Sequence, residues 1–170
     1  YEIGTGDWSS DVCSSDLGAF DDDLNLMDIV LGMGSCTDSN FAAQYNLPGI
    51  YAPIADFTLL KTAYDVAEEK HFSVKVGNVL ASDVFYNDDT TVNDRWKKMG
   101  VLAVDMESAA LYMTAARCRK HALTILTISD HLYRGEKLSA QERQTGFTNM
   151  METALETAVR LQNNRQMEDL

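Results

Sequence analysis

The stretch VLAVDMESAALYMTAARCRKHALTILTISDHL, residues 101–132, decides the fold that the sequence predicts. An apolar run at 101–104 is typical of a buried strand, residues 105–107 open a helix, and a second apolar run covers 122–128. This order predicts a parallel pair of strands with a helical crossover. An acid follows each strand, Glu107 the first and Asp130 the second. Because ligands bind beyond the carboxyl ends of such strands, we expect both carboxylates to face one crevice.

The alternation of strands and helices continues on both sides of this stretch. Upstream it predicts a strand at 26–33, a long connection at 35–55, a helix at 56–70 capped by Asp56, a strand at 72–80 and a short helix at 92–99. Downstream it predicts an irregular, mobile linker at 131–138, then a capping box of Ser139 and Glu142 that starts one long helix ending near residue 162. We therefore expect an α/β protein with one domain at 18–170.

Composition argues against several classes of partner and cofactor. The 170 residues carry a formal net charge of −12 without a basic patch, which argues against nucleic acid or a membrane surface as partner. The cysteines Cys13, Cys36 and Cys118 have unrelated spacings and no histidine pattern for zinc, so we expect free thiols in a reducing cytoplasm and no metal. The sequence contains no membrane-span run and no signal sequence at its start.

Residues 1–17, YEIGTGDWSSDVCSSDL, differ from the remainder because Ser, Asp and Gly dominate and no strand or helix period is present. We expect a disordered tail. The run WSSDVCSSDL also closely resembles the translation of a sequencing adapter that precedes unrelated proteins, so we expect an artefactual origin. On this interpretation the natural protein is truncated near Gly18, and the fold is incomplete at its N-terminus.

Three polar residues have both a chemical and a structural interpretation. Asp130 follows an apolar strand that would bury it, and burial raises the pKa of a carboxyl toward that of a general acid, although such residues are more often caps. Glu107 in a first helical turn favours the helix dipole, and it would also suit two vicinal hydroxyls of a ligand. Arg143 is unfavourable at the start of the last helix, which points to a partner such as Asp130 or to a solvated side chain.

The apolar residues near these acids leave two alternatives open. Phe85, Tyr86 and Met106 are either core residues or the walls of a slot for a flat aromatic ring. Residues 32–34 (GMG) lack both the third glycine of a dinucleotide-binding loop and the Gly-Lys-Ser/Thr ending of a phosphate-binding loop. The residue types alone therefore predict a crevice with a proton donor, without naming the ligand.

Five strings, in order along the chain, resemble the bacterial purine nucleoside phosphorylases of the hexameric type. They are LMDIVLGMGSCTDS (26–39), VGNVLASDVFY (76–86), VDMESAALY (104–112), LTISDHL (126–132) and AQERQTGFTNMM (140–151). The resemblance covers residues 18–161. It implies the nucleoside phosphorylase fold, a three-layer α/β sandwich around a mixed, barrel-like central sheet.

The resemblance also implies a reaction, the reversible phosphorolysis of purine nucleosides and 2′-deoxynucleosides by inorganic phosphate. Asp130 would protonate N7 of the purine while the glycosidic bond breaks, and Arg143 would approach Asp130 when the last helix closes. An aspartate at the acid position implies that 6-aminopurines are accepted as well as 6-oxopurines. No further cofactor is implied, and the intact protein would be a cytoplasmic homohexamer.

The resemblance assigns the nucleoside contacts to five further residues. Glu107 would bind the 2′ and 3′ hydroxyls, with Met106 against the ribose. Phe85 and Val104 would flank the base, with Ser129 beside it.

The sequence departs from the family pattern in two places. Asp105 stands where a glutamate is expected, a mild change outside the direct contacts. The family's phosphate site lies mostly in its N-terminal portion, and of this site Gly18 alone would remain here. The arginine and histidine that a neighbouring subunit contributes are also missing. We therefore expect the chain as given to be inactive.

Other functions remain open at this stage. A uridine phosphorylase of the same fold would read the uracil edge with a Gln and an Arg, and residues 85–87 offer neither. A nucleosidase of the same fold would use water in place of phosphate. A non-catalytic or unstable fragment is the third alternative, since missing strands would expose sheet edges.

Overall fold

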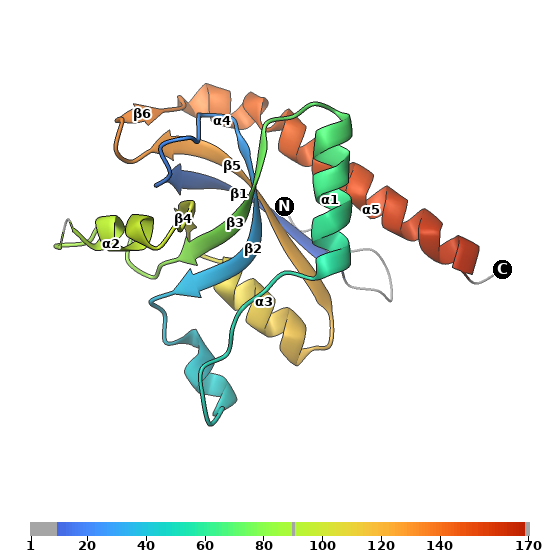
Figure 1. Ribbon diagram of the computed structural model, residues 1–170, viewed down its shortest axis with the longest axis horizontal. Coiled ribbons are helices and arrows are strands. Elements are labelled where there is room, and N and C mark those ends of the chain that lie inside the picture. Colours follow the sequence, from blue (N-terminus) through green and yellow to red (C-terminus); the bar gives the residue numbers. More distant parts are fainter. Residues whose placement is uncertain (1–9, 90, 169–170) are drawn as a thin grey trace.

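The computed structural model describes residues 10–89 and 91–168 of the chain (Figure 1). Its strands are β1 (Ser10–Ala19), β2 (Ile29–Thr37), β3 (Val74–Ala81), β4 (Ala103–Asp105), β5 (His121–His131) and β6 (Glu136–Lys137). Its helices are the 3-10 helix η1 (Phe41–Tyr45) and the α-helices α1 (Phe57–Glu69), α2 (Val92–Lys98), α3 (Ser108–Arg117), α4 (Ala140–Gly146) and α5 (Thr148–Glu168).

The strands form one mixed sheet that closes on itself. Their order is β1-β4-β3-β2-β5-β6, and a further pairing between β1 and β5 completes a five-stranded barrel, with β6 outside it. Strands β2, β3 and β4 run parallel to one another, whereas β1 and β5 run the opposite way. The predicted α/β class with a mixed, barrel-like sheet is confirmed.

The predicted parallel pairing within residues 101–132 is wrong. Strands β4 and β5 lie on either side of β1, which is antiparallel to β4 and parallel to β5. They therefore run in opposite directions and do not contact each other as neighbours. The reason is that hydrophobic periodicity identifies a strand but carries no information about its partner, and here a third strand lies between the two.

Strand β1 includes part of the N-terminal segment that the sequence predicts to be a disordered tail. Its residues pair with β5 from Ser10 opposite His121 to Ala19 opposite His131. Residues 10–17 are thus part of the barrel rather than an irregular tail, while residues 1–9 lie outside the described residues. A β5 without a partner would leave a row of free N–H and C=O groups, and an extended segment of almost any composition can satisfy them. The origin of the segment and the domain boundary near residue 18 stay predictions.

Two layers of helices enclose the barrel (Figure 1). Helices α1 and α5 cover one side, where they bury a cluster with β2 and β5 formed by Ile29, Leu31, Leu59, Ala63, Leu123, Ile125, Met150 and Ala154. Helix α3 covers another side and contacts β2, β3 and β5. The alternate strand residues face the barrel interior, as the period of two requires: Leu17, Ala19, Val30, Val79, Ala103, Leu126 and Ile128, with Leu24 and Leu102.

Local signals located the starts of α1 and α4 correctly, whereas α3 begins at Ser108 and not at the predicted residues 105–107. Asp56 caps α1 by accepting a hydrogen bond from the backbone N–H of Leu59 at 3.0 Å. Ser139 and Glu142 form the predicted capping box at the start of α4. The predicted single helix is instead two, because α4 ends at Gly146 and the next residue, Phe147, packs its partly buried ring onto the α1–α5 cluster. The predicted irregular linker contains the short strand β6. No helix of residues 10–89 and 91–168 is long and apolar enough to cross a membrane.

Candidate active site

Three strand ends converge where the sequence predicts the site. Gly18 of β1 lies level with Val104 of β4 on one side and with Asp130 of β5 on the other. Neighbouring strands are about 4.8 Å apart, so Val104 and Asp130 lie roughly 10 Å apart across Gly18. The segments that carry the two acids therefore lie near each other, with β1 between them, although the strands are not a parallel pair. That both carboxylates face one crevice stays a prediction.

A β-bulge orients Asp130. Leu17 pairs with Ile128, but the next residue, Gly18, pairs with Asp130, so Ser129 is an extra residue in β5. Ile128 faces the barrel interior, and without the bulge Asp130 would follow it there. The bulge instead turns Asp130 to the face shared with Gly18 and Val104, as bulges beside functional sites often do.

Asp130 is held by two donors. Nη2 of Arg143 lies 2.8 Å from Oδ2 of Asp130, and Oγ of Ser129 donates to the same oxygen at 2.8 Å. The pairing that the sequence indicated between Asp130 and Arg143 is present, and a carboxylate held by a charged donor makes a strong hydrogen bond. The predicted burial of Asp130 is wrong, since its side chain is 32% exposed. Asp130 lies near the end of β5, between Ser129 and His131, which are both 1% exposed, so the side chain of Asp130 alone reaches solvent at this point of the strand.

The two predicted ribose contacts lie between β4 and α3. Glu107 is the residue directly before α3 and not in the first helical turn as predicted, and its side chain is exposed. The backbone N–H of Met106 donates to Oε2 of Glu107 at 3.3 Å, and Met106 is 45% exposed. Both side chains are therefore free to meet a ligand.

The predicted base contacts are divided between the surface and the core. Phe85 and Tyr86 follow β3, are 75% and 89% exposed, and pack edge-to-face with ring centroids 4.9 Å apart. They are not core residues, which leaves the slot interpretation. Val104 is half-buried against the cluster of Phe20, Leu80 and Val101.

Gly18 makes a close approach at the end of β1. A Cβ added there would lie 3.2 Å from the side chain of Leu132, just beyond β5. This contact explains the glycine by packing, and its predicted role toward phosphate stays a prediction.

Sequence reasoning missed a buried polar cluster beside these residues. Asp105 is 6% exposed, and its two oxygens accept hydrogen bonds from the backbone N–H of Ser108 at 2.9 Å and from its Oγ at 2.7 Å. Burial raises the pKa of the Asp105 carboxyl to about 6, with Glu107 adding a smaller effect and the Ser108 bonds opposing it. The spacing of an Asp and a Ser three residues apart at a helix start was the signal available.

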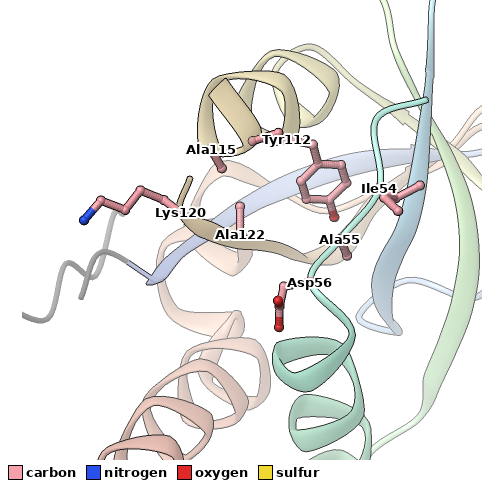
Figure 2. A pocket seen from close by; sticks show the side chains of 8 residues that line it. Ile54, Ala55, Asp56, Tyr112, Ala115, Lys120 and Ala122 are labelled. Carbon is pink, nitrogen blue, oxygen red and sulfur yellow. The ribbon is translucent and has the colours of Figure 1, made fainter. Parts of the chain in front are cut away.

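Two pockets of the described residues are lined by none of the predicted site residues. Figure 2 shows a pocket of about 110 Å³ at the start of β5, lined by Ile54, Ala55, Asp56, Tyr112, Ala115, Ala116, Lys120 and Ala122. Its volume is below the roughly 300 Å³ that small-molecule sites need, and it lies at the opposite end of β5 from Asp130. A wider pocket of about 410 Å³ is lined by Asp38, Asn87, Val92, Arg95, Trp96 and Met99.

The relatives found by comparison with known proteins carry the same name. The chain is 50% identical over 144 residues to the purine nucleoside phosphorylases DeoD-type of Geobacillus sp. (strain WCH70) and Aliivibrio salmonicida (strain LFI1238), which covers 85% of this chain and 61% of each relative. It is 47% identical over 146 residues to the purine nucleoside phosphorylase DeoD-type of Clostridium beijerinckii (strain ATCC 51743 / NCIMB 8052), covering 86% and 62%.

The chain thus spans about 61% of the length of the curated relatives that it matches. The family model described as the phosphorylase superfamily matches residues 17–162, which include every predicted site residue. The closed, mixed barrel between helices agrees with the fold that the sequence resemblance implied. On this match, the chain belongs to the phosphorylase superfamily.

Proposed function

We propose that the whole protein is a pentosyltransferase that cleaves purine nucleosides with inorganic phosphate, and that the described site holds the base and the ribose. The observation that carries the proposal is the Asp130–Arg143 pair at 2.8 Å, at the barrel end where Gly18, Val104 and Asp130 lie level. The names of the relatives at 47–50% identity support the purine substrate class.

In the proposed reaction, protonated Asp130 donates its proton to N7 of the purine. The bond between C1′ and N9 breaks, its electron pair goes to the base, and a phosphate oxygen forms the new bond to C1′. The products are the neutral base and ribose 1-phosphate. Both donors to Asp130 contact Oδ2, so Oδ1 is the oxygen proposed to carry the proton. Arg143 stabilises the carboxylate that the transfer leaves behind.

The nucleoside contacts form the second part of the proposal. The exposed Glu107 carboxylate accepts the 2′ and 3′ hydroxyls, and Met106 packs on the ribose. Phe85 and Val104 flank the base, with Ser129 beside it. Stacking on a purine would bury the Phe85 ring, which is 75% exposed in this structure. Removing this apolar surface from water would make the binding free energy more favourable. Gly18 is the candidate phosphate contact among the described residues.

Assembly of several copies belongs to the proposal as well. Segment 47–57 contains four apolar residues that are largely exposed to solvent. Their exposed fractions are 48% for Leu47, 104% for Ile50, 65% for Ile54 and 74% for Phe57. Exposed apolar side chains gathered in one segment are typical of protein contacts, so we propose this segment as part of the surface between copies in a homohexamer. The cytoplasmic location and the lack of an organic cofactor stay predictions.

The test joins the first part of the Geobacillus relative, up to the residue that matches Leu17, to residues 18–170 of this chain. We expect release of hypoxanthine from inosine and adenine from adenosine that depends on phosphate, with ribose 1-phosphate as the second product. Equal turnover without phosphate would identify a nucleosidase, and preferred cleavage of uridine would identify a uridine phosphorylase. A protein that binds no nucleoside in calorimetry would leave the non-catalytic alternative.

A further inference from the structure

Asp105 is a buried acid for which the proposed reaction has no use so far. It ends β4, two residues before Glu107, and is 6% exposed. The ion pairs of the described residues do not include it; its oxygens instead accept hydrogen bonds from Ser108, at 2.9 and 2.7 Å, and the backbone N–H of Glu107 interacts with the carboxylate as well. A buried carboxyl without a cation costs folding free energy, so its presence beside a ligand-binding residue calls for a functional explanation.

The bonds of Asp105 fix the turn that carries Glu107. Its carboxylate holds the first residue of α3, Ser108, through both the backbone N–H and Oγ. Its own carbonyl oxygen accepts the N–H of Ser82 at 3.0 Å, which ties the turn to the end of β3. Met106 and Glu107 are thereby held between two fixed residues. The chain has little freedom left in this turn except in the two side chains that the proposed function assigns to the ribose.

A second link continues from Ser108 into β2. The Oγ atoms of Ser108 and Ser35 lie 2.8 Å apart, and the N–H of Ser35 donates to the carbonyl of Pro53 at 2.9 Å. Both hydroxyls are buried, since Ser108 is 0% and Ser35 is 4% exposed. The N-terminus of α3 is therefore anchored to the barrel from two directions.

We propose that Asp105, acting through Ser108 and Ser35, is a positioning residue that sets the Glu107 carboxylate for the ribose hydroxyls. The inference rests on the proposed function, because it assumes that Glu107 meets a ribose. It accounts for a buried carboxylate at this position, since Ser108 contacts both of its oxygens, whereas the amide of an Asn carries one acceptor oxygen. The raised pKa of the Asp105 carboxyl, about 6, agrees with a group kept for its position at the expense of stability.

The test compares Asp105→Asn and Ser108→Ala with a matched control, Asp56→Asn. Asp56 also accepts one backbone N–H, from Leu59 at 3.0 Å, and contacts one side chain, Nδ1 of His121 at 2.6 Å, but it lies beside the start of β5 and makes no described hydrogen bond to the turn before α3. Two measurements are made on the full chain. Calorimetry gives the affinities for inosine and for 2′,3′-dideoxyinosine, and amide hydrogen exchange follows Met106 and Glu107 without ligand.

We expect the wild type to bind inosine more tightly than the dideoxy compound. Asp105→Asn and Ser108→Ala should lose about tenfold in inosine affinity, leave the dideoxy affinity unchanged, and exchange the Met106 and Glu107 amides faster. Asp56→Asn should match the wild type in both measurements. The positioning role is overturned if both variants prefer inosine over the dideoxy compound as strongly as the wild type does and their Met106 and Glu107 amides exchange at the wild-type rate. The proposed function would still stand in that case. If the wild type binds neither compound, the proposed function fails. In that case unchanged amide exchange at Met106 and Glu107 in the variants also overturns the positioning role, whereas faster exchange supports it.

Discussion

The two ends of β5 are built in contrasting ways. Near its start, Tyr112 of α3 inserts its hydroxyl between β2 and β5, where it donates to the carbonyl of Gly32 and lies 2.7 Å from Oγ1 of Thr124. The fit is tight enough that a Cβ on Gly32 would lie 2.4 Å from that Oγ1. At the other end, a bulge and a partly exposed ion pair replace close packing. The start of β5 is built for stability, and its end keeps polar groups accessible.

This contrast predicts where substitutions change activity and where they change stability. Substitutions at the Asp130 end should alter chemistry with little loss of stability, or even with a gain. Substitutions at the Tyr112 end should do the reverse. The predictions below run from the largest expected effect to the smallest.

Asp130→Asn should reduce adenosine cleavage by about 10²- to 10⁴-fold in the joined protein, because the amide cannot deliver a proton to N7. Inosine should lose less, since its O6 can accept a hydrogen bond from an amide as charge builds on the base. Initial rates with both substrates at saturating phosphate measure the difference. An equal loss for both would contradict the assignment of Asp130 as the N7 acid.

Asp105→Asn should raise the free energy of unfolding at pH 7.5 by up to about 3 kcal/mol, which corresponds to a folded pKa of about 6 against the usual 3.8. The sign follows from the raised pKa: the stabilising contribution of the protonated acid is complete below pH 3.8 and is lost as the pH rises through 6. The gain over the wild type should therefore shrink between pH 7.5 and pH 4.5. Urea denaturation of both proteins at the two pH values measures it, and a variant less stable at pH 7.5 would refute the cost of burial.

Tyr112→Phe should lower the free energy of unfolding by about 1–3 kcal/mol, because it leaves the buried carbonyl of Gly32 and the N–H of Thr124 without this hydroxyl. The affinity for inosine should change little, since Tyr112 contacts the start of β5. Thermal denaturation and calorimetry on the same preparation separate the two effects. A large loss of affinity with unchanged stability would break the contrast between the two ends.

Ser139→Ala should have the smallest effect, a loss of about 1 kcal/mol, because it removes half of the capping box that starts α4. Helix α4 carries Arg143, so fraying should weaken the Asp130–Arg143 pair and lower kcat modestly in the joined protein. The Michaelis constant for the nucleoside should stay unchanged. A rise in that constant with kcat intact would show that α4 acts on binding instead.

Local signals were sufficient for several parts of the fold. The cap at Asp56 and the capping box at Ser139 were each predicted from a short pattern, whereas the residues alone left a pairing of Arg143 with Asp130 open beside a solvated arginine. A cap depends on interactions within one turn, which the sequence displays, but the partner of a charge depends on segments that are distant in the chain. The exposure of Asp130 was predicted wrongly, because burial depends on what packs over a strand end.

By itself, the sequence determined the α/β class, the positions of the main helices and strands, and the residue types gathered near the ends of β4 and β5. Tertiary structure alone decided that β1 lies between these strands, that Ser129 forms a bulge, and that Asp105 is buried against Ser108 and Ser35. Each of these depends on the register between segments far apart in the chain. Register is set by closing the barrel, and no local period encodes it.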